Sequence, residues 1–125
     1  MPLATFLVED NPVIRSNLTS ALQDLLGAQV IGTAETEEDA VAWLASHKSN
    51  WTLAVVDLFL KQGNGLGVVR ACRPHSPTQR VVVLTNYVTP DSRARCIAEG
   101  ADAFFDKSTD LDAFLMYCEA ADGLR

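Results

Sequence analysis

Three short runs of almost uninterrupted apolar residues most constrain how this chain folds. They read TFLV at residues 5–8, LAVV at 53–56 and VVVL at 81–84. Runs of this kind are typical of strands that helices cover on both faces, as in a parallel sheet. With two weaker runs they predict five strands, over residues 3–8, 29–33, 53–57, 80–85 and 103–105.

Segments with the period of an α-helix separate the predicted strands. Pro12 suits the first position of the first helix, and Thr36 and Ser108 are predicted to cap the second and fifth helices. A third helix is predicted over residues 65–72, and a fourth after Thr89. The expected apolar faces comprise Ile14, Leu18, Ala21, Leu22 and Leu25 in the first helix, Ala40, Val41 and Leu44 in the second, and Leu111, Phe114, Leu115 and Cys118 in the fifth.

The order of these elements predicts one α/β domain over residues 1–125, built on an open, doubly wound parallel sheet. A length of 125 residues suits one compact domain. A closed barrel of βα units would need about twice that length. In doubly wound sheets the ligand site lies beyond the carboxyl ends of the strands, so the residues at those ends are the candidates for chemistry.

Polar residues end or follow four of the predicted strands. Glu9 and Asp10 follow the first strand, Asp57 ends the third, Thr85 ends the fourth and Lys107 follows the fifth. Because parallel strands share one carboxyl edge, we expect three carboxylates, a hydroxyl and an ammonium to converge there. Each residue alone is common as a cap, a strand residue or a surface charge. The five together, in this order, favour a functional site.

Carboxylates that lie close together repel one another unless a cation or a proton intervenes. A hard divalent ion such as Mg²⁺ or Mn²⁺ prefers oxygen ligands, so we expect Asp10 and Asp57 to bind the ion directly and Glu9 to bind it through water. A carboxylate nucleophile also forms an aspartyl phosphate. The metal, Lys107 and Thr85 would then hold the phosphoryl oxygens during transfer.

The chain resembles the receiver domains of bacterial response regulators in the segments FLVEDNPVIR, VVDLFLKQGNGLGVV, VVVLTNY and GADAFFDKS. The resemblance spans essentially the whole chain and implies a (βα)5 flavodoxin-like fold with strand order 2-1-3-4-5. It implies that Asp57 takes a phosphoryl group from a sensor histidine kinase or phosphotransfer protein, and that the protein is no enzyme beyond self-phosphorylation and self-dephosphorylation. The residue roles that it implies are metal ligation by Asp10, Asp57, the backbone carbonyl of Phe59 and, through water, Glu9; phosphate binding by Lys107; and a switch formed by Thr85 and Phe104.

The sequence departs from the commonest receiver pattern at two places. Leu60-Lys61 stands where many members have Met-Pro, and Ser108 stands where many have a proline after a cis bond. Because a cis bond before a non-proline residue costs about 3–4 kcal/mol, we expect a trans bond before Ser108. The Lys-Ser form resembles regulators that often carry a helix-turn-helix output domain. The output partner is therefore expected to be another protein or a domain outside these 125 residues.

Composition narrows the expected partners and compartment. A net charge of −6 argues against direct binding of nucleic acid, whose phosphates require basic contacts. No apolar run approaches the roughly 20 residues of a membrane span, and the N-terminus lacks the basic region of a signal peptide. We therefore expect a cytoplasmic protein that does not enter a membrane. Cys72, Cys96 and Cys118 form no CxxC pair and are expected to be buried thiols.

Two further expectations concern output and the lifetime of the phosphorylated state. The fifth helix carries no basic residue between Ser108 and Gly123, which argues against the reciprocal ion-pair dimer that some receivers form through the fourth helix, fifth strand and fifth helix. Phe59 and Tyr87 stand two residues after Asp57 and Thr85. If both flank the acceptor, they would hinder the attacking water and slow self-dephosphorylation.

Three other functions are alternatives. A flavodoxin-like carrier of FMN has the same fold, but the acids of the first loop would repel a phosphate. A phosphatase of the haloacid dehalogenase type needs a second aspartate two residues after the nucleophile, where Phe59 stands. A receiver-shaped interaction module that is never phosphorylated is compatible with the same residues.

Overall fold

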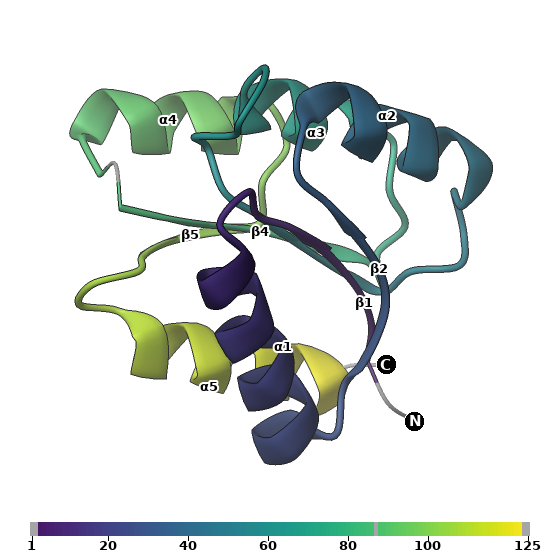
Figure 1. The fold of residues 1–125 in the computed structure, drawn as a ribbon, viewed down its shortest axis with the longest axis vertical. Coiled ribbons are helices and arrows are strands. Elements are labelled where there is room, and N and C mark those ends of the chain that lie inside the picture. Colours follow the sequence, from purple (N-terminus) through teal and green to yellow (C-terminus); the bar gives the residue numbers. More distant parts are fainter. Residues whose placement is uncertain (1–2, 87, 124–125) are drawn as a thin grey trace.

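The computed structural model describes residues 3–86 and 88–123. Within these residues strands and helices alternate along the chain (Figure 1). The order is β1 (Ala4–Val8), α1 (Pro12–Leu26), β2 (Gln29–Ala34), α2 (Glu37–Ser46), β3 (Leu53–Val56), α3 (Gly65–Ala71), β4 (Arg80–Thr85), α4 (Pro90–Ala98), β5 (Ala103–Asp106) and α5 (Leu111–Gly123).

The strands form one parallel sheet in the order β2-β1-β3-β4-β5. This confirms the predicted fold and strand order. The predicted bounds of β4 match those observed, and the bounds of the other strands differ by one residue at one end. Continuous apolar runs located these strands because β1, β3 and β4 are buried on both faces.

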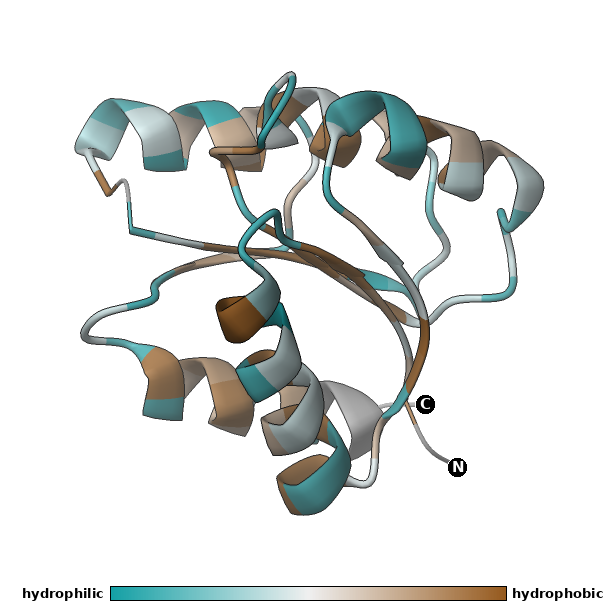
Figure 2. Ribbon diagram, viewed as in Figure 1, coloured by the Kyte–Doolittle hydropathy of each residue, from teal (hydrophilic) through white to brown (hydrophobic). Residues whose placement is uncertain are grey.

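Helices cover the two faces of the sheet in separate layers. Helices α2, α3 and α4 lie on one face, and α1 and α5 lie on the other (Figure 1). Successive strand residues point to opposite layers: Val81 and Val83 pack toward α2, α3 and α4, and Val82 and Leu84 pack toward α1 and α5. The sheet is the most hydrophobic part of the ribbon, whereas the helices carry many hydrophilic residues (Figure 2).

Helix caps set where the chain turns back after each strand. The Asn11 side chain accepts hydrogen bonds from the backbone N–H groups of Val13 and Ile14. This cap starts α1 at Pro12, directly after Glu9, Asp10 and Asn11. Thr36 caps α2 as predicted, and Thr89 caps α4 in a reciprocal bond with Ser92. These caps keep the connections at the carboxyl edge of the sheet short.

Four details of the predicted helices are wrong. Leu111, which was expected on the apolar face of the fifth helix, is exposed. Leu25 is 66 % exposed, and Leu26 packs against the core in its place. Val41 is also exposed, so the apolar face of α2 narrows to Ala40 and Leu44. Ser108 does not cap α5, because its hydroxyl donates to the side-chain oxygen of Asn86 and the helix begins later, at Leu111.

Two expectations from composition can be compared with the described residues. Cys72, Cys96 and Cys118 are buried and unpaired, as predicted. Among residues 3–86 and 88–123, no helix is both long and apolar enough to cross a membrane.

Candidate functional site

The carboxyl edge of the sheet brings together the five residues singled out from the sequence. Asp57 follows β3, and its N–H donates to the carbonyl of Val8 at the end of β1 (3.0 Å). Lys107 follows β5, and its N–H donates to the carbonyl of Thr85 at the end of β4 (2.9 Å). These two hydrogen bonds tie the backbones of Asp57 and Lys107 to the ends of the neighbouring strands.

Three carboxylates meet at this edge. Glu9, Asp10 and Asp57 each offer an oxygen, and these oxygens lie within 4.8 Å of one another. Glu9 and Asp57 are buried, with 1 % and 7 % of their surface exposed, and Asp10 is half-buried. Like charges this close and this poorly solvated are stabilised by a nearby cation or by a bound proton.

Lys107 supplies one such cation. Its Nζ donates to Oε1 of Glu9 and, at 2.9 Å, to Oδ2 of Asp57. Burial by itself would lower the pKa of Lys107, but the hydrogen bonds to Glu9 and Asp57 and the charges of these two residues raise it above its ordinary value. The lysine is therefore an ammonium over the whole physiological pH range.

The carboxyl of Glu9 titrates unusually. Burial raises its pKa and the negative charge of Asp57 adds to this effect, although hydrogen bonds from Lys107 and from the N–H of Asn11 oppose it. With every group ionised, three carboxylates against one ammonium leave two uncompensated negative charges. The set of oxygen donors and this residual charge fit a hard divalent cation.

A cavity of about 230 Å³ opens over these groups. Thr85 is fully buried in the fold and lines this cavity together with Asp57 and Lys107. The complete lining is Glu9, Asp10, Asn11, Ile14, Asp57, Phe59, Thr85, Asn86 and Lys107. The cavity is large enough to hold a phosphoryl group beside the carboxylates.

The remaining predicted site residues differ in how far the structure describes them. The backbone N–H of Phe59 donates to Oδ1 of Asp57 (3.3 Å), and Phe59, which lines the cavity, is 56 % exposed. Phe104 is buried, and the guanidinium of Arg93 lies 5.0 Å above its ring. Tyr87 lies outside the described residues. The bond before Ser108 is trans, as expected.

Sequence reasoning missed two residues that shape the site. Asn86 lines the cavity and accepts a hydrogen bond from Ser108 (3.0 Å). Arg15 donates to the backbone carbonyl of Glu9 (2.9 Å) and pairs with Glu35. The position of Asn86, directly after a strand end, was a usable signal. Arg15 carried none, because its contact depends on how α1 packs against the sheet.

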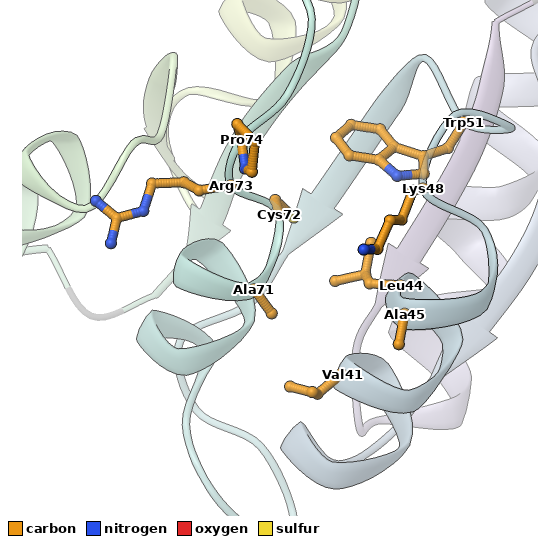
Figure 3. Close-up of a pocket in the computed structure, with 9 residues that line it drawn as sticks. All are labelled: Val41, Leu44, Ala45, Lys48, Trp51, Ala71, Cys72, Arg73 and Pro74. Carbon is orange, nitrogen blue, oxygen red and sulfur yellow. The ribbon is translucent and has the colours of Figure 1, made fainter.

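A second cavity, of about 370 Å³, lies between α2 and α3 (Figure 3). It is lined by residues that precede β3 and β4, such as Trp51 and Pro74, and therefore lies at the opposite end of the sheet. Lys48 and Arg73 are the charged residues of its lining, and the Arg73 side chain points away from it (Figure 3). This cavity takes no part in the carboxylate site.

Comparison with known proteins agrees with this geometry. The family model described as the response regulator receiver domain matches residues 5–119. The DNA-binding transcriptional activator DevR/DosR of Mycobacterium tuberculosis is 32 % identical over 106 residues, which are 82 % of this chain and 46 % of that protein. The response regulator protein VraR of Staphylococcus saprophyticus is 25 % identical over 109 residues, which are 87 % of this chain and 51 % of that protein. The chain thus spans about half the length of these relatives.

A solved structure has the same fold. The CheX-CheY-BeF3-Mg²⁺ complex of Borrelia burgdorferi contains a chain that superposes with a TM-score of 0.85 at 21 % identity. The match covers 96 % of this chain and 89 % of that one.

Proposed function

The chain belongs to the response regulator receiver domain family of two-component systems, and we propose that it accepts a phosphoryl group on the side chain of Asp57. The observation that carries this proposal is the contact between the Asp57 carboxylate and the Lys107 ammonium inside the strand-end cavity, with Glu9 and Asp10 beside it. Such a set combines a nucleophile, a fixed positive charge and donors for a metal ion.

The three carboxylates are suited to hold Mg²⁺ or Mn²⁺. Asp10 and Asp57 would bind the ion directly, Glu9 would bind through water, and the backbone carbonyl of Phe59 would complete the protein ligands. When bound, the ion supplies charge that offsets the negative charges of the phosphoryl oxygens. The Borrelia burgdorferi complex, named for BeF3 and Mg²⁺, supports this assignment by similarity of fold.

In the proposed transfer, an oxygen of Asp57 attacks the phosphorus of a donor phosphohistidine. A P–O bond to Asp57 forms, the P–N bond of the donor breaks, and its electron pair stays on the imidazole nitrogen. Lys107 needs little movement to contact a phosphoryl oxygen, since its ammonium already lies 2.9 Å from the acceptor carboxylate. The Thr85 hydroxyl would donate to another phosphoryl oxygen from the buried end of β4.

The proposed donor and output partner rest on membership of the receiver family. We propose that a histidine kinase or a phosphotransfer protein supplies a phosphohistidine, which is the kind of labile phosphoryl donor that forming an aspartyl phosphate needs. Thr85 and Phe104 would form the switch that passes the change at Asp57 to α4, β5 and α5, the face that controls an output protein or domain. The name of DevR/DosR, a DNA-binding transcriptional activator, supports an output that acts on DNA through another domain.

Mass spectrometry of the intact protein tests the proposal directly. The parent, Asp57→Asn and Asp24→Asn are each incubated with Mg²⁺ and a small acyl phosphate. Asp24 is a matched control because it is an exposed aspartate on α1. We expect one added phosphoryl group in the parent and in Asp24→Asn, none in Asp57→Asn, and none in the parent without divalent metal. A parent that gains no phosphoryl group from acyl phosphate or from a phosphohistidine donor would favour an interaction module that is never phosphorylated.

A further inference from the structure

We propose that Glu37, in the first turn of α2, is a positioning residue for the metal and phosphoryl site. It holds the loop between β3 and α3 in the conformation that places the Phe59 backbone beside Asp57. The inference rests on the proposed function of Asp57 and adds to it a residue from a helix that lines no part of the cavity.

The loop in question, residues 58–64, folds back over the end of β3. The N–H of Gly65 donates to the carbonyl of Leu58 (2.9 Å), and Phe59 and Asn64 form an antiparallel bridge. A Cβ atom on Gly65 would collide with the backbone carbonyl of Asp57. Asn64 therefore lies directly beside Phe59, and the return of the chain depends on the missing side chain at Gly65.

Glu37 makes two hydrogen bonds to this loop. Its backbone N–H donates to the carbonyl of Gln62 (3.0 Å), and its Oε1 accepts a hydrogen bond from the N–H of Asn64 (2.9 Å). Thr36 and Gln62 also form a parallel bridge. A series of contacts thus connects Glu37 through Asn64 to Phe59, whose N–H donates to Oδ1 of Asp57 (3.3 Å).

Two glycines leave the space that the Glu37 side chain occupies. Gly63 has φ +81, and a Cβ atom there would collide with the Cβ atom of Glu37. A Cβ atom on Gly67 would collide with Oε2 of Glu37. The glycines of the segment QGNGLG are therefore explained by close approach: Gly65 to the acceptor strand, and Gly63 and Gly67 to Glu37. None of them is needed to contact a phosphate.

Glu37 also contacts the residue that caps α3. Its carboxylate accepts the N–H of Asn64, while the Asn64 side chain accepts the N–H of Leu66 (2.6 Å). Glu37 therefore favours the conformation in which Asn64 both caps α3 and pairs with Phe59.

Titration calorimetry with Mg²⁺ tests the role of Glu37 without any phosphoryl transfer. The proteins are the parent, Glu37→Ala, Glu37→Gln and the control Glu38→Ala, which removes an exposed acid from the same turn. We expect Glu37→Ala to weaken Mg²⁺ binding roughly tenfold, as the loss of a group that orients metal ligands does. Glu37→Gln keeps an oxygen that can accept from Asn64, so its affinity should stay close to that of the parent, as should that of Glu38→Ala.

A second substitution displaces Glu37 without removing it. Gly67→Ala should push the carboxylate away from Asn64 and weaken Mg²⁺ binding in the parent. The same change in Glu37→Ala should have no further effect, because no carboxylate remains to be displaced. Equal effects of Gly67→Ala in the two backgrounds would overturn the inference.

Two further measurements distinguish a failure of this inference from a failure of the proposed function. They are urea unfolding of each variant and phosphorylation of the parent. A lower unfolding midpoint for Glu37→Ala with unchanged Mg²⁺ affinity would mean that Glu37 is only structural, and would overturn the inference alone. A parent that binds no Mg²⁺ and accepts no phosphoryl group would overturn the proposed function and this inference with it.

Discussion

The Nζ atom of Lys107 lies 2.9 Å from Oδ2 of Asp57, although the two residues are 50 positions apart in the sequence. The contact exists because β3 and β5 flank β4 in a parallel sheet, so that the ends of all three strands reach the same edge. Lys107 is the cation that contacts the buried carboxylates of Glu9 and Asp57. Replacing it should therefore lower the stability of the fold as well as impair phosphoryl transfer.

Replacing Lys107 by Met keeps most of the side-chain volume and removes the charge. Glu9 and Asp57 would then be buried near each other without their cation, so we expect the free energy of unfolding at pH 7 to fall by about 3 kcal/mol. Added Mg²⁺ should restore part of this loss. Urea unfolding measures both effects, and Lys61→Met, at a side chain that is 61 % exposed, is the control. Equal losses in the two variants would contradict the assigned role of Lys107.

Glu9 should make stability depend on pH. Burial raises the pKa of Glu9 in the folded protein above the ordinary value of 4.5, which holds in the unfolded chain. At pH values between the unfolded-state pKa and the folded-state pKa, the folded state therefore binds more protons than the unfolded state. The contribution of Glu9 to stability is therefore complete below pH 4.5 and is lost as the pH rises through the folded-state pKa.

Glu9→Gln removes this titration. Without metal, the stability of the variant relative to the parent should increase from pH 4 to pH 7, as measured by urea unfolding at several pH values. The exposed Glu38→Gln serves as the control and should show little such trend. A constant difference between Glu9→Gln and the parent across this range would show that the Glu9 pKa is not raised.

The three thiols should be unreactive in the folded protein. Burial raises the pKa of Cys72 and Cys118 to about 12 and that of Cys96 to about 11, so almost no thiolate exists at pH 8. A disulfide-exchange reagent at pH 8 should detect three thiols at once in urea, and only slow reaction in native buffer. A rapid native reaction of one thiol would identify a local opening at that helix.

Phe59 should prolong the lifetime of the phosphorylated state. Its side chain lines the strand-end cavity together with Asp57 and is 56 % exposed, so it would limit the approach of water to a phosphoryl group on Asp57. We expect Phe59→Ala to lose the phosphoryl group severalfold faster than the parent, as followed by intact mass over time. Met116→Ala, an exposed apolar residue on α5, should behave like the parent. An unchanged rate for Phe59→Ala would mean that the ring does not shield the acceptor.

Local sequence patterns were sufficient where the burial of a segment decides its structure. The strands were found because their burial on both faces leaves continuous apolar runs, and β4 was predicted to the residue. Glu9, Asp10, Asp57, Thr85 and Lys107 were found for a related reason. Each stands at a strand end, and parallel topology brings all strand ends to one edge.

Other features depend on how elements dock, which no single segment encodes. The packing of α1 places Leu26, which is partly buried, against the core and leaves Leu25 exposed, although both fit the helical period. The bond from Ser108 to Asn86 displaces the start of α5 from the position that the Ser108 side chain predicted. Likewise, the acidic first turn of α2 predicts a helix start, but it does not show that Glu37 bonds to Asn64, 27 residues away.

The sequence by itself determined the sheet, its layers and the chemical identity of the residues at its carboxyl edge. It did so because buried strands are continuous apolar runs and the helices between them have apolar residues at helical spacing. Only the tertiary structure decided which charges pair, where the covered face of each helix ends and which loop is hydrogen-bonded to which helix. Those outcomes depend on distances between atoms far apart in sequence, such as Lys107 to Asp57 and Glu37 to Asn64. Such distances are set by the relative placement of whole elements.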